Sequence, residues 1–185
     1  PDIFPDIEVG EALTHGGLAV FPLYTVSGAG VDYQVAAAAL ESGQVSVEEV
    51  DGDGDVPYLR VTNSGDTRVF FMEGEELVGG KQNRAVNTSV LAGANSSIRI
   101  PVSCVEEHRW GFGGFSQFPG VPGEKMGSEL NCFSPEVRNS LRSSVSGSLR
   151  RSLGHSSSQR ELGEEIKKEQ DELRVRSATH AMKDT

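Results

Sequence analysis

The feature that most constrains the fold is a succession of short strand patterns between residues 45 and 105. The runs are rich in Val, Ile, Phe and Tyr, and turn sequences separate them about every ten residues, a spacing typical of antiparallel sandwiches and barrels. We therefore expect an α+β domain built on an antiparallel β sandwich or barrel of about six or seven strands.

Individual strands are predicted from local patterns. Residues 45–50 alternate apolar and polar side chains for most of their length, which indicates a half-buried strand. Residues 58–62 and 68–72 flank a strong turn at 63–66, which predicts a β-hairpin. The other expected strands are residues 18–24, 85–91 and 97–105, with a turn at 92–95 before the last of them.

Helices are expected on both sides of the strand-rich stretch. Residues 33–42 are rich in Ala and predict a short helix, with Asp32 as N-cap and Gly43 as the C′ residue. Ser134 and Pro135 predict the start of a longer helix that ends near residue 153. A last helix is expected at residues 159–174. The predicted apolar faces of the two C-terminal helices are Val137, Leu141, Val145 and Leu149, and Leu162, Ile166 and Leu173.

The domain organisation follows from changes in composition. Residues 1–16 are acidic and form an N-terminal arm, and residues 17–110 form the β-rich core. Residues 111–133 are a Gly/aromatic loop, interpreted either as a lid that closes over a ligand or as a linker that packs on the sheet. Residues 134–185 are a helical C-terminal segment of the same domain. The chain starts without Met, which leaves open that it is a fragment of a longer protein.

Charge excludes one class of partner. The formal net charge is −10, and residues 1–80 hold 15 acidic and two basic residues. Binding to a phosphate backbone depends on cationic contacts, so a nucleic-acid partner is not expected. A small phosphorylated ligand is still compatible with the sequence, because Lys81, Arg84 and Arg109 lie in its more basic half.

Cysteine content and hydropathy indicate the cellular compartment of the protein. Two cysteines, Cys104 and Cys132, are too few for a disulfide framework and favour reduced thiols, although one bridge is left open. No apolar run approaches the ~20 residues of a membrane span. The first residues have neither a basic region nor an apolar stretch, unlike a secretory signal. We expect a cytoplasmic protein without a membrane partner.

The first of two polar blocks is residues 74–84. Its Gly79–Gly80 pair permits a tight turn, and the following Lys81, Gln82, Asn83 and Arg84 could hold a phosphate or a carboxylate. If the preceding strand continues to Glu75, then Glu73 and Glu75 share a face. Such a pair can transfer protons or bind a hard cation, and the alternative is a solvated strand end.

The second polar block is residues 100–110. On a strand, Cys104, Glu106 and His108 lie on one face, an arrangement compatible with zinc or with a Cys nucleophile and His base. The spacing matches no known metal or catalytic signature, so an inert buried thiol is favoured and no metal site is predicted. We expect the two blocks to face each other and form a site.

Together the blocks resemble a known family. Residues 74–84, 100–106 and 109–110 are similar to a domain family named for its association with ADP-ribosylglycohydrolases and rhodanese–phosphatase proteins. Weaker similarity begins near residue 18, continues through residues 39–45, resumes at residue 159 and ends at residues 176–179. The resemblance implies a role near NAD or ADP-ribose metabolism. It implies no established activity, so catalytic residues, cofactor and substrate stay unassigned.

Our leading hypothesis is a small-ligand site for a nucleotide or an ADP-ribose-like molecule. In it Lys81, Arg84 and Arg109 bind phosphate. Glu75, Glu76 and Glu106 hold ribose hydroxyls or a cation, and Trp110 stacks on the ligand. The full set of predicted ligand-binding residues is Glu75, Glu76, Lys81, Gln82, Asn83, Arg84, Glu106, Arg109 and Trp110. The alternative is a non-enzymatic domain that binds a protein partner or a second copy of itself as a homo-oligomer.

Overall fold

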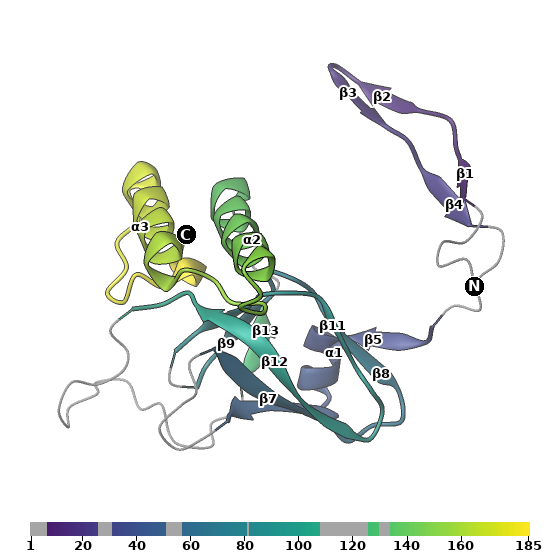
Figure 1. The fold of residues 1–185 in the computed structure, drawn as a ribbon, viewed down its shortest axis with the longest axis horizontal. Coiled ribbons are helices and arrows are strands. Elements are labelled where there is room, and N and C mark those ends of the chain that lie inside the picture. The colour runs from purple at the N-terminus through teal and green to yellow at the C-terminus, as the bar shows by residue number, and fades with distance from the viewer. Residues whose placement is uncertain (1–6, 26–30, 51–56, 81, 108–125, 130–133) are drawn as a thin grey trace. The chain divides into compact units, whose positions relative to one another are not determined.

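A computed structural model describes residues 7–25, 31–50, 57–80, 82–107, 126–129 and 134–185 (Figure 1). The chain divides into two compact units, Pro1–Asp32 and Tyr33–Thr185. The second unit combines helices with antiparallel sheets and is the α+β fold expected from the sequence.

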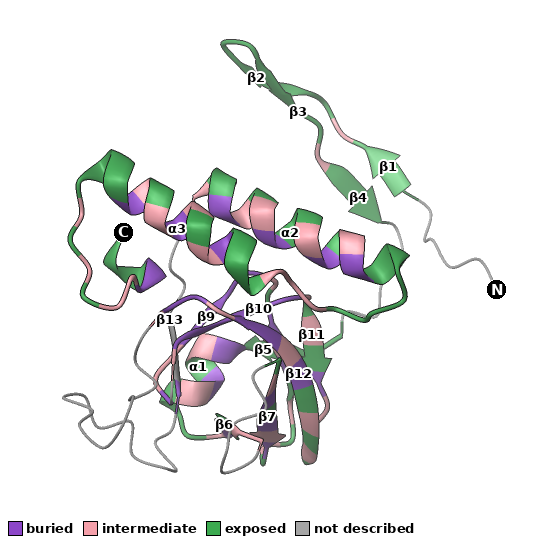
Figure 2. Cartoon of the chain, turned by 60° about the vertical axis from the view of Figure 1, so that its left-hand side comes forward, coloured by how far each residue is buried: buried purple, intermediate pink, exposed green. Residues whose placement is uncertain are grey.

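The first unit is a long hairpin of short strand pairs. The pairs are antiparallel and join β1 (Ile7–Val9) to β4 (Leu23–Thr25) and β2 (Leu13–His15) to β3 (Leu18–Val20). The predicted strand at residues 18–24 is therefore interrupted, and the carbonyl of Pro22 at the break accepts a hydrogen bond from Gly10 N at 2.7 Å. The residues of β1 to β4 are exposed and are coloured green in Figure 2.

Two sheets form the centre of the second unit. The larger sheet is antiparallel throughout and has the order β13 (Gly127–Glu129), β9 (Glu76–Val78), β10 (Arg84–Val86), β12 (Ser96–Cys104), β7 (Tyr58–Asn63) and β6 (Val45–Glu49). The smaller sheet has the order β11 (Val90–Ala92), β8 (Arg68–Phe71) and β5 (Tyr33–Val35). In it β8 pairs antiparallel with β11 and parallel with β5.

One apolar core lies between these sheets. Along β6 and β7 buried and more exposed side chains alternate, and the buried apolar ones are Val45, Val47, Leu59 and Val61. The smaller sheet contributes Phe71 to this core. The short helix α1 (Ala36–Glu41) adds two small buried side chains to the same core. Inward-facing residues at period two are what a half-buried sheet requires.

A second core joins the C-terminal helices to the larger sheet. Helices α2 (Pro135–Arg150) and α3 (Gln159–Leu173) lie side by side over this sheet in both views (Figures 1 and 2). A short 3-10 helix, η1 (Met182–Asp184), follows. The core consists of Ala85, Val105, Val137, Leu141, Val145, Leu162, Ile166 and Met182. Among the helices that the structure describes, none is long and apolar enough to span a bilayer.

The C-terminal helices begin where the sequence predicted. Ser134 Oγ accepts a hydrogen bond from Val137 N at 3.1 Å, and Ser158 Oγ accepts one from Glu161 N at 3.3 Å. The predicted apolar faces are too long, because Leu149 and Leu173 are 45% and 56% exposed. Both residues lie in the last turn of their helices.

The prediction for residues 33–42 is wrong in its first part. Residues 33–35 form the edge strand β5, and α1 begins only at Ala36 with Val35 at its N-cap position. Asp32 is therefore not the N-cap. Gly43 has a φ of 74°, which confirms its predicted role after the helix end.

The predicted hairpin at residues 58–72 is also wrong, because β7 and β8 belong to different sheets. The reason is the side chain of Asn63, which is 1% exposed. Its Nδ2 donates to the carbonyl oxygens of Thr67 at 2.9 Å and Gly93 at 2.8 Å. These bonds satisfy a buried amide at the place where the chain crosses between the sheets.

The strand predicted at residues 85–91 is two strands, β10 and β11, in different sheets. The break occurs at Asn87, which is 2% exposed. Asn87 N donates to Pro101 O at 3.0 Å, and Asn87 Nδ2 donates to His155 O at 2.8 Å. The predicted turn at 92–95 is confirmed, with Asn95 in a left-handed conformation at a φ of 48°. Of the predicted loop at residues 111–133, only residues 126–129 are described, and they include strand β13, so this part is not a loop. The rest of the range lies outside the described residues.

Candidate functional site

The two polar blocks lie beside each other, as expected. Strand β10 pairs with the end of β12 so that Arg84 is opposite Cys104. The turn before β10 uses both glycines in left-handed conformations, with φ of 118° at Gly79 and 59° at Gly80. Side chains other than hydrogen are strained in these conformations, so the glycine pair sets the path of the first block.

A buried hydrogen-bond network joins the blocks. Asn83 Nδ2 donates to Glu76 Oε1 at 3.1 Å, and Gly79 N donates to Asn83 Oδ1 at 3.1 Å. Asn83 N donates to Glu106 Oε2 at 2.9 Å. The side chains of Glu76, Asn83 and Glu106 are all buried. The network closes the turn of the first block and attaches it to the second.

Glu75 has a separate position. It is 4% exposed, and its Oε2 accepts a hydrogen bond from Met72 N at 2.9 Å. The predicted face shared by Glu73 and Glu75 is wrong, because β8 ends at Phe71 and the chain turns at residues 73–74. Glu73 instead forms an ion pair with Arg142 of α2.

Arg84 is the largest wholly buried side chain of the site, with no exposed surface. Its Nη1 donates to Gln82 Oε1 at 3.1 Å, and its Nη2 lies 3.6 Å from Glu49 Oε1. Among the described residues, neither Nε nor Nη2 of Arg84 has a hydrogen-bond acceptor. A buried donor that lacks an acceptor is costly, so Arg84 keeps capacity for a further acceptor.

A cavity of about 400 Å³ adjoins this network. It lies between the ends of β10 and β12 on one side and α3 with the C-terminal segment on the other. Its lining residues are Gln82, Cys104, Val105, Glu106, Glu107, Gln159, Gly163, Ile166 and His180. Cys104 N donates to Gln159 Oε1 at 2.9 Å, which links the sheet to the helix across the cavity.

The predicted site residues therefore divide into groups. Gln82 and Glu106 line the cavity, whereas Glu76, Asn83 and Arg84 lie behind its wall. The described residues do not include Lys81, Arg109 and Trp110, or the His108 that shares a predicted strand face with Cys104 and Glu106. Within the described ranges, no three His, Cys, Asp or Glu side chains cluster as metal ligands would.

The sequence did not single out three polar residues of the cavity: Glu107, Gln159 and His180. Glu107 forms an ion pair with Lys167 of α3, with its Oε2 2.7 Å from Nζ. The similarity to the family in residues 159 and 176–179 could have directed attention to this part of the chain.

Cys104 is a free, half-buried thiol beside Arg84. Burial raises the pKa of this thiol, and the positive charge of Arg84 only partly offsets that effect, while the charge of Glu49 adds to it. A raised pKa leaves a smaller thiolate fraction at neutral pH. This raised pKa argues against an activated nucleophile at Cys104.

Alkylation should reveal this raised pKa. We expect the rate at which iodoacetamide modifies Cys104 to rise with pH, and its midpoint to lie at a higher pH in the native protein than in urea. The reason is that the raised pKa leaves less thiolate in the native protein than in the denatured protein at the same pH. Mass spectrometry of the peptide that contains Cys104 measures the rate. A native midpoint at or below the denatured one would contradict the raised pKa.

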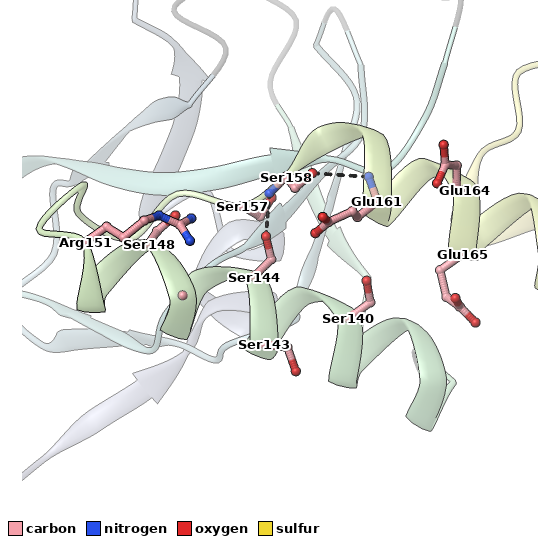
Figure 3. Close-up of a pocket in the computed structure, with 11 residues that line it drawn as sticks. Ser140, Ser143, Ser144, Ser148, Arg151, Ser157, Ser158, Glu161, Glu164 and Glu165 are labelled. Atoms are coloured by element: carbon pink, nitrogen blue, oxygen red, sulfur yellow. Dashed lines mark hydrogen bonds between the residues drawn. The ribbon is translucent and has the colours of Figure 1, made fainter.

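A larger hollow of about 700 Å³ lies between α2 and α3 (Figure 3). Serines and glutamates make up most of its lining, with Arg151 at one end. Ser144 Oγ accepts a hydrogen bond from Ser158 N at 2.6 Å, so these hydroxyls serve the start of α3. Three glutamates, Glu161, Glu164 and Glu165, and one cation, Arg151, give its lining a net negative charge.

The fold and the site define a class of protein: an α+β domain with a polar cavity and a buried hydrogen-bond network at the ends of two central strands, β10 and β12, of its larger sheet. The chain belongs to the family of the ARG and Rhodanese-Phosphatase-superfamily-associated Protein domain, whose family model matches residues 6–185. The match confirms the predicted resemblance to a rhodanese–phosphatase-associated domain family, while the link to ADP-ribosylglycohydrolases stays a prediction. The chain has no significant match to a curated protein or to a solved structure.

Proposed function

We propose that this domain binds a small polar ligand of the nucleotide or ADP-ribose type in the cavity lined by Gln82, Cys104 and Glu106. The observation that carries the proposal is Arg84, a wholly buried cation whose Nε and Nη2 atoms have no hydrogen-bond acceptor of N or O type among the described residues. Its guanidinium contacts Gln82 and Cys104, which line the cavity. The cavity volume of about 400 Å³ lies in the ~300–1,000 Å³ range of small-molecule sites.

The ligand's anionic part is assigned to Arg84. In this structure Nη1 of the guanidinium donates its hydrogen bond to Gln82 Oε1. A phosphate would therefore reach Arg84 when the Gln82 side chain rotates away. A guanidinium can bind two phosphate oxygens at once through parallel N–H groups. Lys81 and Arg109 are proposed to add charge, and Trp110 is proposed to stack on a base.

The family name supports the ligand class. If ARG denotes ADP-ribosylglycohydrolase, the domain is associated with proteins whose chemistry involves ADP-ribose. ADP-ribose combines a diphosphate with ribose hydroxyls, which matches a cavity that has a cation behind it and carboxylates on its wall. The proposal is limited to binding and includes no reaction.

A thermal-shift titration tests the proposal. At a ligand concentration of 100 times Kd we expect ADP-ribose to raise Tm by about 5–10 °C, because ligand binding to the native state alone adds about 2.7 kcal/mol of stability. Lys81→Ala should reduce that shift. Lys168→Ala is the matched control, since Lys168 is exposed and lines neither hollow, and it should keep the full shift.

A second candidate function, self-association or protein binding, is favoured by the first unit. Its hairpin exposes large apolar side chains, among them Leu13, Leu18, Phe21 and Leu23. An isolated two-stranded hairpin is only marginally stable in water. Light scattering on the titration samples separates the candidates: a mass well above that of the monomer, with no Tm response to ADP-ribose, NAD or ATP, would replace the first proposal by the second.

A further inference from the structure

The C-terminal segment, residues 177–182, forms part of the cavity wall. Glu107 N donates to Thr179 O at 2.7 Å, and Met182 N donates to Val105 O at 2.9 Å. These backbone bonds attach the segment along the end of the second block. His180 lies between the two attachment points and lines the cavity.

The backbone at His180 is in a sparsely populated conformation. Its φ of 47° is left-handed, which is uncommon for a residue other than glycine. Such a conformation persists where the surroundings impose it, and functional sites are one of the places where it gathers. Here the buried residues Ala181 and Met182 hold the segment in place, so His180 keeps its position on the cavity wall.

Gln170 of α3 determines which ring nitrogen of His180 carries the proton. Gln170 is 3% exposed, and its Nε2 donates to Ala181 O at 2.8 Å. A carbonyl oxygen only accepts, so the amide cannot be reversed without placing two acceptors together. Gln170 Oε1 therefore faces His180 Nδ1, at 3.0 Å. Because Oε1 also only accepts, Nδ1 must carry a hydrogen.

We infer that His180, whose Nδ1 hydrogen is held by Gln170 Oε1, offers the lone pair of Nε2 to the cavity and receives a hydroxyl group of a ribose-type ligand. A neutral imidazole with hydrogen on Nδ1 has its lone pair on Nε2. The carboxylates of Glu106 and Glu107 line the same cavity and only accept, although Glu106 Oε2 already accepts from Asn83 N and Glu107 Oε2 is paired with Lys167. A wall rich in acceptors selects a ligand part that donates several hydrogen bonds, as a sugar diol does.

This inference rests on the proposed function, since it assigns the sugar end of the same ligand. The two assignments are complementary: the buried Arg84 guanidinium takes the anionic end, and His180 with the carboxylates takes the hydroxyl end. A ligand that carries phosphate but no hydroxyl donor should therefore not depend on His180.

The first test uses the ligand-free protein. Nitrogen-15 NMR of the imidazole should show His180 as the Nδ1–H tautomer in the wild type, and Gln170→Leu should lose that preference. A wild-type His180 with hydrogen on Nε2 would overturn the inference while leaving the proposed function intact. No ligand is needed, so the test is independent of whether ADP-ribose binds.

The second test compares ADP-ribose with inorganic pyrophosphate by calorimetry. His180→Phe should weaken ADP-ribose binding about tenfold, the equivalent of one hydrogen bond of about 1.4 kcal/mol, and should leave pyrophosphate binding unchanged. His15→Phe, in the exposed strand β2, is the matched control. Equal ADP-ribose affinity in the wild type and in His180→Phe would refute the inference, whereas no binding of either probe to the wild type would refute the proposed function itself.

Discussion

Replacing Asn83 by alanine should lower the free energy of unfolding by about 2–4 kcal/mol. The Asn83 side chain accepts from Gly79 N and donates to Glu76 Oε1, and it has no exposed surface. Alanine removes both bonds, and the backbone amide and the carboxylate stay in a place where water cannot replace the lost partner. Urea denaturation followed by circular dichroism measures the change.

The matched control for Asn83→Ala is Asn139→Ala. Asn139 is exposed on α2, and its replacement should change stability by no more than about 0.5 kcal/mol. A loss of less than about 1 kcal/mol for Asn83→Ala would show that the network does not hold the first block. The same result would weaken the proposed site, because Gln82 and Arg84 follow directly from that turn.

Elements with a local physical cause were predictable from the sequence. Val45 and Val47 alternate with polar residues because one face of β6 is buried. Ser134 caps α2 through its own hydroxyl, and Gly43 follows α1 with a positive φ. In each case the residue that gives the signal is also the residue that makes the interaction.

Elements that depend on distant partners were not predictable. Asn63 is a typical turn residue, but its amide is bound to Gly93, thirty positions further on. Asn87 divides the strand predicted at residues 85–91 because its amide bonds to His155 O. A local pattern contains no information about these partners, so the hairpin and the single strand were the natural predictions.

The candidate site also has a part that the sequence predicted and a part that depends on distant contacts. The adjacency of the two blocks was predictable, since both have strong strand patterns around polar residues. The sequence could not distinguish buried network residues such as Glu76 from a cavity residue such as Glu106, because both are glutamates in the same blocks. It also passed over His180, whose position depends on Gln170 and on backbone pairing with the second block.

Replacing Arg84 by methionine should lower the free energy of unfolding by about 3–5 kcal/mol. Arg84 has no exposed side-chain surface, and Glu49, 3.6 Å away, is only 15% exposed. Removing the cation leaves the Glu49 carboxylate with less compensation for its desolvation. The double variant Arg84→Met/Glu49→Gln removes both charges and should recover at least half of the loss. Urea denaturation of the wild type, both single variants and the double variant gives the coupling energy.

The exposed pair Arg60 and Glu48 is the matched control, because these residues lie opposite each other on β7 and β6. Arg60→Met should cost less than about 1 kcal/mol, and a similarly small cost for Arg84→Met would contradict a buried ion pair. The double variant also separates structure from binding. If it regains stability and ADP-ribose still raises its Tm as in the wild type, Arg84 serves the fold alone. If stability returns without a ligand response, Arg84 is the anion-binding part of the site.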